Sequence, residues 1–174
     1  QMLKTANLDV VCVTLPSYLH REHVISALEA GKHVICEKPL ALSLEDSLDI
    51  ARKCGSTGKR VLVAHVARFF PEYETIRTRL LAGDAGAAQS VYARLVSLMP
   101  REGSWFRDAD KSGGVVFDLM IHDIDYVMWL FGSAIAEVGA EWVASDGVKS
   151  VRAILRYEAG KRAVIEAGWG ARAF

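Results

Sequence analysis

The sequence predicts an α/β protein in which a partial parallel sheet is followed by an α+β domain with a mostly antiparallel, open sheet. Three observations predict this order. Short β-branched runs alternate with helical segments before residue 70, the pattern changes after Pro71, and residues 135–169 form apolar runs separated by turn residues. We place the domain boundary after residue 69, which gives segments 1–69 and 70–174.

The first segment has the order strand, helix, strand, helix, strand. The runs at residues 8–15, 33–36 and 61–66 are rich in Val, Ile and Leu, as expected of strands buried on both faces of a parallel sheet. The first helix is expected to begin at an N-cap, Ser17, and end at Gly31. Its predicted face comprises Leu19, His23, Ala27 and Ala30. Ser43 with Asp46 resembles a capping box and opens a second helix that runs to about Cys54.

The second segment opens with a helix that has Pro71 in its first turn and closes at Gly83. Residues 90–98 alternate loosely between apolar and polar, as in a sheet with one solvated face. A long helix is predicted over residues 114–131, stopped by Gly132. Residues 135–144, 148–157 and 162–169 are read as a meander with turns at 145–147 and 158–160.

The composition indicates a soluble globular protein, with 51% hydrophobic and 24% charged residues. Lys plus Arg and Asp plus Glu both number 21, and the scattered basic residues argue against a nucleic-acid partner. No apolar run approaches the roughly 18 residues that span a bilayer, and no signal peptide is evident. We therefore expect a cytoplasmic protein with no membrane partner. The three cysteines, Cys12, Cys36 and Cys54, are interpreted as core residues rather than as a redox or metal site.

Ionisable residues lie on one stripe of the long, largely apolar helix. At about 100° per residue Asp118, His122 and Asp125 share this stripe, whereas Asp123 points to the opposite side. Buried carboxylates need a partner, so two interpretations stay open. Asp118 could orient His122 as an acid/base facing a substrate cavity, or the pair could satisfy itself in a structural network. A metal site at this spacing is a weaker third interpretation, and we predict no metal.

A second group of candidates follows the predicted strands. Ligands of doubly wound sheets lie beyond the carboxyl ends of the strands, which places Lys38 over the crevice. There a lysine can stabilise an alkoxide, although a surface lysine before a turn proline is the simpler reading. The same rule puts five further residues on the ligand side, each weak evidence alone: Thr14, Pro16, His20, His65 and Arg68.

These segments together resemble the glucose-fructose oxidoreductase, inositol dehydrogenase and rhizopine-catabolism family of NAD(P)-dependent oxidoreductases. The resemblance rests on residues 9–16 with Leu19-His20, on residues 30–34 leading into Glu37-Lys38-Pro39-Leu40, on residues 68–71, and on Ser112-Gly113-Gly114 with Asp118, residues 121–125, Trp129 and Gly132. It spans most of the chain.

The resemblance implies a Rossmann domain followed by an α+β domain whose open sheet usually packs against another subunit. Loss of the first strands would also leave an unpaired sheet edge, so we expect a homo-oligomer. It implies hydride transfer between NAD or NADP and a carbinol of a small-molecule sugar, cyclitol or related polyol. By that resemblance Lys38 contacts the reacting hydroxyl, Asp118 binds substrate and His122 is the general acid/base. Thr14, Pro16, His20 and Glu37 would line the nicotinamide ribose end of the cofactor.

The chain departs from the family pattern in one major respect. No Gly-x-Gly-x-x-Gly follows any strand, so the pyrophosphate loop is absent. We expect the last strands of the family's second domain to be missing as well. We therefore expect a fragment, truncated before its first residue and after its last, that holds no NAD or NADP firmly by itself. The alternative is a non-catalytic binding or assembly module that retains the fold without the cofactor half.

Overall fold

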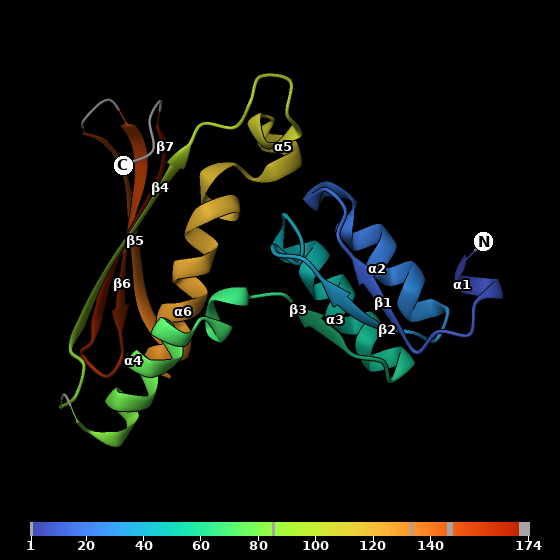
Figure 1. Ribbon diagram of the computed structural model, residues 1–174, viewed down its shortest axis with the longest axis horizontal. Coiled ribbons are helices and arrows are strands. Elements are labelled where there is room, and N and C mark those ends of the chain that lie inside the picture. Colours follow the sequence, from blue (N-terminus) through green and yellow to red (C-terminus); the bar gives the residue numbers. More distant parts are fainter. Residues whose placement is uncertain (1, 85, 133, 146–147, 171–174) are drawn as a thin grey trace. The chain divides into compact units, whose positions relative to one another are not determined.

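The computed structural model describes residues 2–84, 86–132, 134–145 and 148–170 (Figure 1). They form two compact units. The first comprises the residues up to His65 together with Glu102–Gly114, and the second comprises Val66–Arg101 together with the residues from Val115 onward. No sequence pattern predicts that Glu102–Gly114 belongs with the first unit.

The first unit is built on a parallel sheet. Strands β1 (Val10–Val13), β2 (His33–Cys36) and β3 (Val61–Val63) lie in the order β1-β2-β3, which confirms the predicted α/β order. β1 and β3 are shorter than their apolar runs. The other elements of this unit are α1 (Met2–Thr5), η1 (Ser17–Leu19), α2 (His20–Glu29), α3 (Leu44–Thr57), η3 (Trp105–Arg107) and α5 (Ala109–Ser112).

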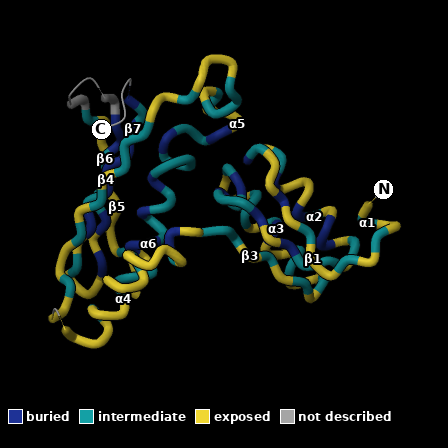
Figure 2. The backbone as a smooth tube through the Cα atoms, viewed as in Figure 1, coloured by how far each residue is buried: buried dark blue, intermediate teal, exposed yellow. Residues whose placement is uncertain are grey.

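Helices α2 and α3 cover the same face of this sheet. Leu28 of α2 and Ile50 of α3 are buried in one apolar cluster with side chains from alternate strand positions: Val13, Val34 and Cys36. On the other face Val10 is 45%, Ile35 40% and Leu62 63% exposed (Figure 2). The expectation that the strands are buried on both faces is therefore wrong for these residues, because both helices pack on one side.

The start of α2 also differs from the prediction. Ser17 is buried in η1, and α2 begins at His20 without a side-chain cap. The buried face of α2 includes His20, Val24 and Leu28, whereas His23 is exposed. The second predicted cap is confirmed, since the Ser43 side chain accepts a hydrogen bond from the Asp46 amide at 3.0 Å.

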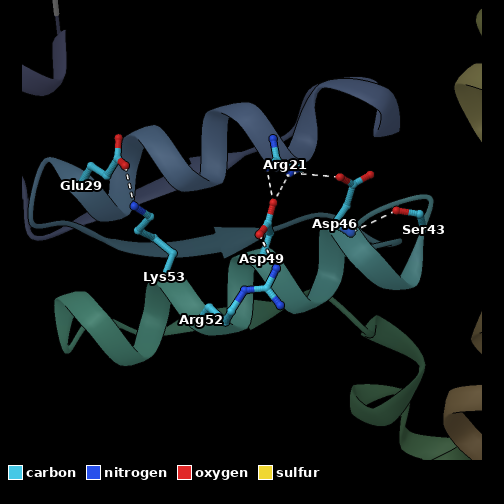
Figure 3. A network of polar contacts seen from close by, with 7 residues as sticks. All are labelled: Arg21, Glu29, Ser43, Asp46, Asp49, Arg52 and Lys53. Atoms are coloured by element: carbon cyan, nitrogen blue, oxygen red, sulfur yellow. Dashed lines mark hydrogen bonds and ion pairs between the residues drawn. The ribbon is translucent and has the colours of Figure 1, made fainter.

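Ion pairs join α2 to α3 on their outer surface (Figure 3). Arg21 of α2 contacts both Asp46 and Asp49 of α3, and Lys53 Nζ lies 2.6 Å from Glu29 Oε1. These side chains are largely solvated, so each pair contributes little to stability.

The second unit pairs helices with a mixed four-stranded sheet. Its elements are η2 (Val66–Phe69), α4 (Pro71–Ala82), β4 (Ser90–Leu98), η4 (Val116–Met120), α6 (Ile121–Phe131), β5 (Ile135–Ser145), β6 (Val148–Tyr157) and β7 (Arg162–Gly170). The strand order is β4-β7-β6-β5. β5, β6 and β7 are antiparallel and β4 runs parallel to β7, which confirms a mostly antiparallel sheet. The predicted turn at 145–147 lies partly outside the described residues.

One face of this sheet carries the core of the second unit. Met120 of η4 and Val127 and Phe131 of α6 pack in one apolar cluster with Leu155 of β6 and Ile165 of β7. The opposite face carries a polar cluster. There the carboxylate of Glu166, 3% exposed, accepts hydrogen bonds from the side chains of Arg94, Arg152 and Ser150. Burial raises the pKa of Glu166, but these three donors outweigh burial and hold the pKa below its ordinary value.

None of the helices in the described ranges is long and apolar enough to cross a membrane.

Candidate functional site

The candidate residues of the first unit gather at the carboxyl ends of β1 and β2. Val13 pairs with Cys36 in the parallel register, and the Glu37 amide donates to the Val13 carbonyl at 2.9 Å. Thr14 and Glu37 therefore leave the sheet side by side. Thr14 is exposed, and Pro16, Glu37 and Lys38 are half-buried, so these side chains remain accessible within this unit.

His20 ties the two loops of this edge together. It is 1% exposed, its Nδ1 lies 2.7 Å from the Pro39 carbonyl oxygen and its Nε2 lies 2.7 Å from the Leu15 carbonyl oxygen. Both ring nitrogens thus face backbone acceptors. His20 links the loop after β1 to the loop after β2, and its contact with a cofactor stays a prediction.

The loop after β2 is ordered by its own first residues. Glu37 Oε2 accepts a hydrogen bond from the Lys38 amide at 3.2 Å, and the Lys38–Pro39 peptide bond is cis. The carboxylate of Glu37 therefore helps to define the backbone on which Lys38 stands.

The candidate residues of the second unit lie on two helical segments that follow one another. The sequence predicted one continuous helix, but Val116–Met120 forms a π-helical turn before α6 begins. The Ile121 amide donates to the Val116 carbonyl, five residues earlier. Asp118 stands in this wider turn and His122 in the first turn of α6, and both are half-buried. π-Helical turns within helices are frequent at functional sites.

The third residue of the predicted stripe, Asp125, is held by an arginine of the same unit. Arg68 Nε and Nη2 donate to the two carboxylate oxygens of Asp125 at 2.8 and 2.6 Å. The hydrogen bond to Asp125 raises the pKa of Arg68. Asp125 is 10% exposed and Arg68 40% exposed at the side chain. Arg68, predicted only as a weak ligand-side candidate, thus fastens η2 to α6.

Sequence reasoning missed the environment of Asp123. This residue is 7% exposed, its Oδ2 has no hydrogen-bond partner among the described residues, and burial raises its pKa to about 6. The helical periodicity placed Asp123 opposite His122 but did not reveal that this side is packed. A charged residue on a helix that is apolar almost all round was the signal that could have found it.

Metal-ligating side chains do not cluster in the part of the chain that the structure describes. No group of three or more His, Cys, Asp or Glu side chains converges within the described ranges. Cys36 is buried, and desolvation raises the pKa of its thiol to about 12. Cys54 is half-buried, but Cys12 is exposed on the uncovered sheet face, so its predicted core position is wrong.

Two family descriptions match the chain along most of its length. "Oxidoreductase family, NAD-binding Rossmann fold" matches residues 1–65, and "GFO/IDH/MocA C-terminal domain" matches residues 73–174.

Individual proteins of known name are also similar. The chain is 35% identical over 126 residues to 2,7-anhydro-N-acetylneuraminate hydratase of Escherichia coli K12, which covers 71% of this chain and 34% of that protein. It is 33% identical over 139 residues to scyllo-inositol 2-dehydrogenase (NAD(+)) of Bacillus subtilis 168, covering 79% and 40%. An NAD-binding protein from Listeria innocua has a TM-score of 0.86 at 29% identity, covering 99% of this chain and 50% of that one.

The chain thus spans half or less of the length of these three relatives. The agreement nevertheless extends over both units, from the parallel sheet with its Glu37-Lys38-Pro39 loop to the helical segments η4 and α6 that carry Asp118 and His122. This chain belongs to the GFO/IDH/MocA family of NAD-binding oxidoreductases.

Proposed function

We propose that this chain is part of a longer oxidoreductase that moves a hydride between NAD or NADP and a carbinol of a sugar, cyclitol or related polyol. One observation carries the proposal: an NAD-binding family match coincides with a half-buried Asp118 and His122 in the helical segment of the second unit. The relative named for scyllo-inositol supports this substrate class.

The roles we propose follow from residue chemistry. Oxidation of a carbinol removes a hydride from carbon and a proton from oxygen, and the nicotinamide, when bound, accepts the hydride. His122 takes the hydroxyl proton, since imidazole exchanges protons near neutral pH. Lys38 stabilises the developing alkoxide by donating to its oxygen. Asp118 accepts hydrogen bonds from substrate hydroxyl groups and so orients the sugar or polyol.

We propose that the first unit contacts only the nicotinamide end of a dinucleotide. Thr14, Pro16 and Glu37 stand at the carboxyl ends of β1 and β2, where the nicotinamide ribose would lie. No Gly-x-Gly-x-x-Gly occurs in the sequence, so backbone amides of that type are not available for the pyrophosphate.

We therefore expect this chain to bind NAD or NADP weakly or not detectably. Calorimetric titration of the chain with each dinucleotide measures this directly. A dissociation constant near micromolar would contradict the proposal that the phosphate-binding half lies elsewhere in a longer protein.

The second candidate is a non-catalytic binding or assembly module. A Gly-x-Gly-x-x-Gly encoded upstream of Gln1 in the same reading frame would favour the oxidoreductase, and a start codon at Met2 would favour the module.

We also propose that the protein is a homo-oligomer. Val138 is 64% and Trp142 77% exposed on β5, an edge strand of the second sheet, and large exposed apolar side chains of this kind favour association. Light scattering should give a mass above 19.1 kDa. A clean monomer at high concentration would count against association.

A further inference from the structure

We propose that Arg68 is a positioning residue for His122 and acts through Asp125. This inference rests on the proposed function for the role of His122, but its test requires neither cofactor nor turnover. The carrying observation is the two-pronged contact of Arg68 with Asp125, a carboxylate one turn along α6 from His122.

The geometry of α6 brings Asp125 close to His122. Residues three apart in an α-helix are neighbours, with Cβ atoms about 5–6 Å from each other. Asp125 is only 10% exposed at its side chain, so its charge is poorly screened by water. Without Arg68, this carboxylate would favour the charged imidazolium of His122 and could turn toward it.

Arg68 opposes both effects. Its Nε and Nη2 engage both carboxylate oxygens at 2.8 and 2.6 Å, which holds Asp125 toward η2. The guanidinium also cancels much of the electric field of the carboxylate. The proton affinity of the His122 imidazole therefore depends on the opposite charges of both Arg68 and Asp125. The charged groups that accompany His122 along this stripe are Asp118 on η4 and Asp125 on α6, and Arg68 joins them from η2.

The test is the pH midpoint at which the His122 ring titrates in NMR spectra of the chain. The sequence has five histidines, so the resonance is assigned with His122→Asn. Arg68→Met removes the positive charge beside Asp125 and should raise the midpoint by about 0.3–1 pH unit. Asp125→Asn leaves Arg68 unbalanced and should lower it by a similar amount. The double variant should return close to the wild-type value, and Arg68→Lys, which keeps the charge, should stay near it.

Arg77→Met is the matched control. Arg77 also packs on α6, with its guanidinium 4.3 Å from the Trp129 ring centroid and its Nε 3.3 Å from the Trp129 carbonyl oxygen, but these contacts involve no carboxylate. Its substitution should move the midpoint much less than Arg68→Met. Circular dichroism verifies that each variant is folded. If Arg68→Met does not fold, the shift of Asp125→Asn tests the inference by itself.

Shifts of Arg68→Met and Asp125→Asn in the same direction, or no larger than that of Arg77→Met, would overturn the inference. Opposite shifts support it, because a contact that only stabilises the fold would not reverse sign with the charge removed. If the shifts appear but His122→Asn leaves turnover intact, the pairing stands and the proposed role of His122 fails.

Discussion

Replacing His122 by asparagine is expected to lower the rate of hydride transfer by about 10²–10⁴-fold in the longer protein that we propose, because the hydroxyl proton loses its acceptor. Asparagine keeps a polar side chain of similar size but cannot take up a proton at neutral pH. The pH dependence of kcat should lose the limb that reports the base. The measurement is nicotinamide absorbance during steady-state turnover across a pH series.

His23→Asn is the matched control for this substitution. His23 is an exposed histidine of α2 whose Nδ1 lies 3.0 Å from the Leu19 carbonyl oxygen, and we assign it no role in the reaction. This control should retain wild-type kcat. A general base contributes far more than a threefold rate effect. If His122→Asn retains activity within about threefold of His23→Asn, then His122 is not that base.

Substitutions of Lys38 and Asp118 should change the kinetic constants differently from the substitution of His122. Lys38→Met removes a donor to the developing alkoxide, so kcat should fall and the pH limb assigned to His122 should remain. Asp118→Asn should chiefly raise KM for the polyol, because Asp118 is proposed to bind substrate hydroxyl groups.

The sequence predicted those features of the parallel unit that depend on residues close to one another along the chain. The β-branched run at residues 33–36 became β2 with the same bounds, since Glu37-Lys38-Pro39 stops it. Ser43 caps α3 because its side chain accepts a hydrogen bond from the Asp46 amide, only three residues along the chain. Such features depend on residues close in sequence and can be read without the fold.

Features that depend on distant segments were not readable. The π-helical turn at Val116–Met120 lies in a stretch that is apolar on nearly every side, so periodicity carried no mark of a register change. His20 gave no sign of its burial, because its two partners, Leu15 and Pro39, belong to loops after different strands. The candidate residues came from helical periodicity and from the ends of the predicted strands. The family resemblance supplied their roles, and those roles stay predictions.

Asp123 provides the largest stability effect that we expect. Burial raises its pKa from 3.8 to about 6, so the folded state favours the protonated carboxyl. That shift corresponds to on the order of 3 kcal/mol. The carboxyl also lies near Tyr73 of α4, whose pKa is raised first by burial and then by the charge of Asp123. Ionised Asp123 is thus an unfavourable charge in the packing of α6.

The direction of the pH dependence follows from this. Between about pH 4 and pH 6 the folded state binds more protons at Asp123 than the unfolded state does, so the contribution of this group to stability falls as pH rises. Asp123→Asn removes the charge at nearly constant shape. We expect its free energy of unfolding to exceed that of the wild type by about 1–2 kcal/mol at pH 7.5, less than the full shift because a buried amide also requires hydrogen bonds.

The difference between variant and wild type should shrink as pH falls from about 6 to about 4, because the wild-type carboxyl then takes up its proton. Urea unfolding followed by circular dichroism at several pH values measures this difference. Asp110→Asn, at an exposed position of α5, is the control and should show no such trend. Two results together would show that the ionised carboxylate is compensated in the folded chain. Asp123→Asn would be less stable than wild type at pH 7.5, and it would be no more stable than wild type at any lower pH.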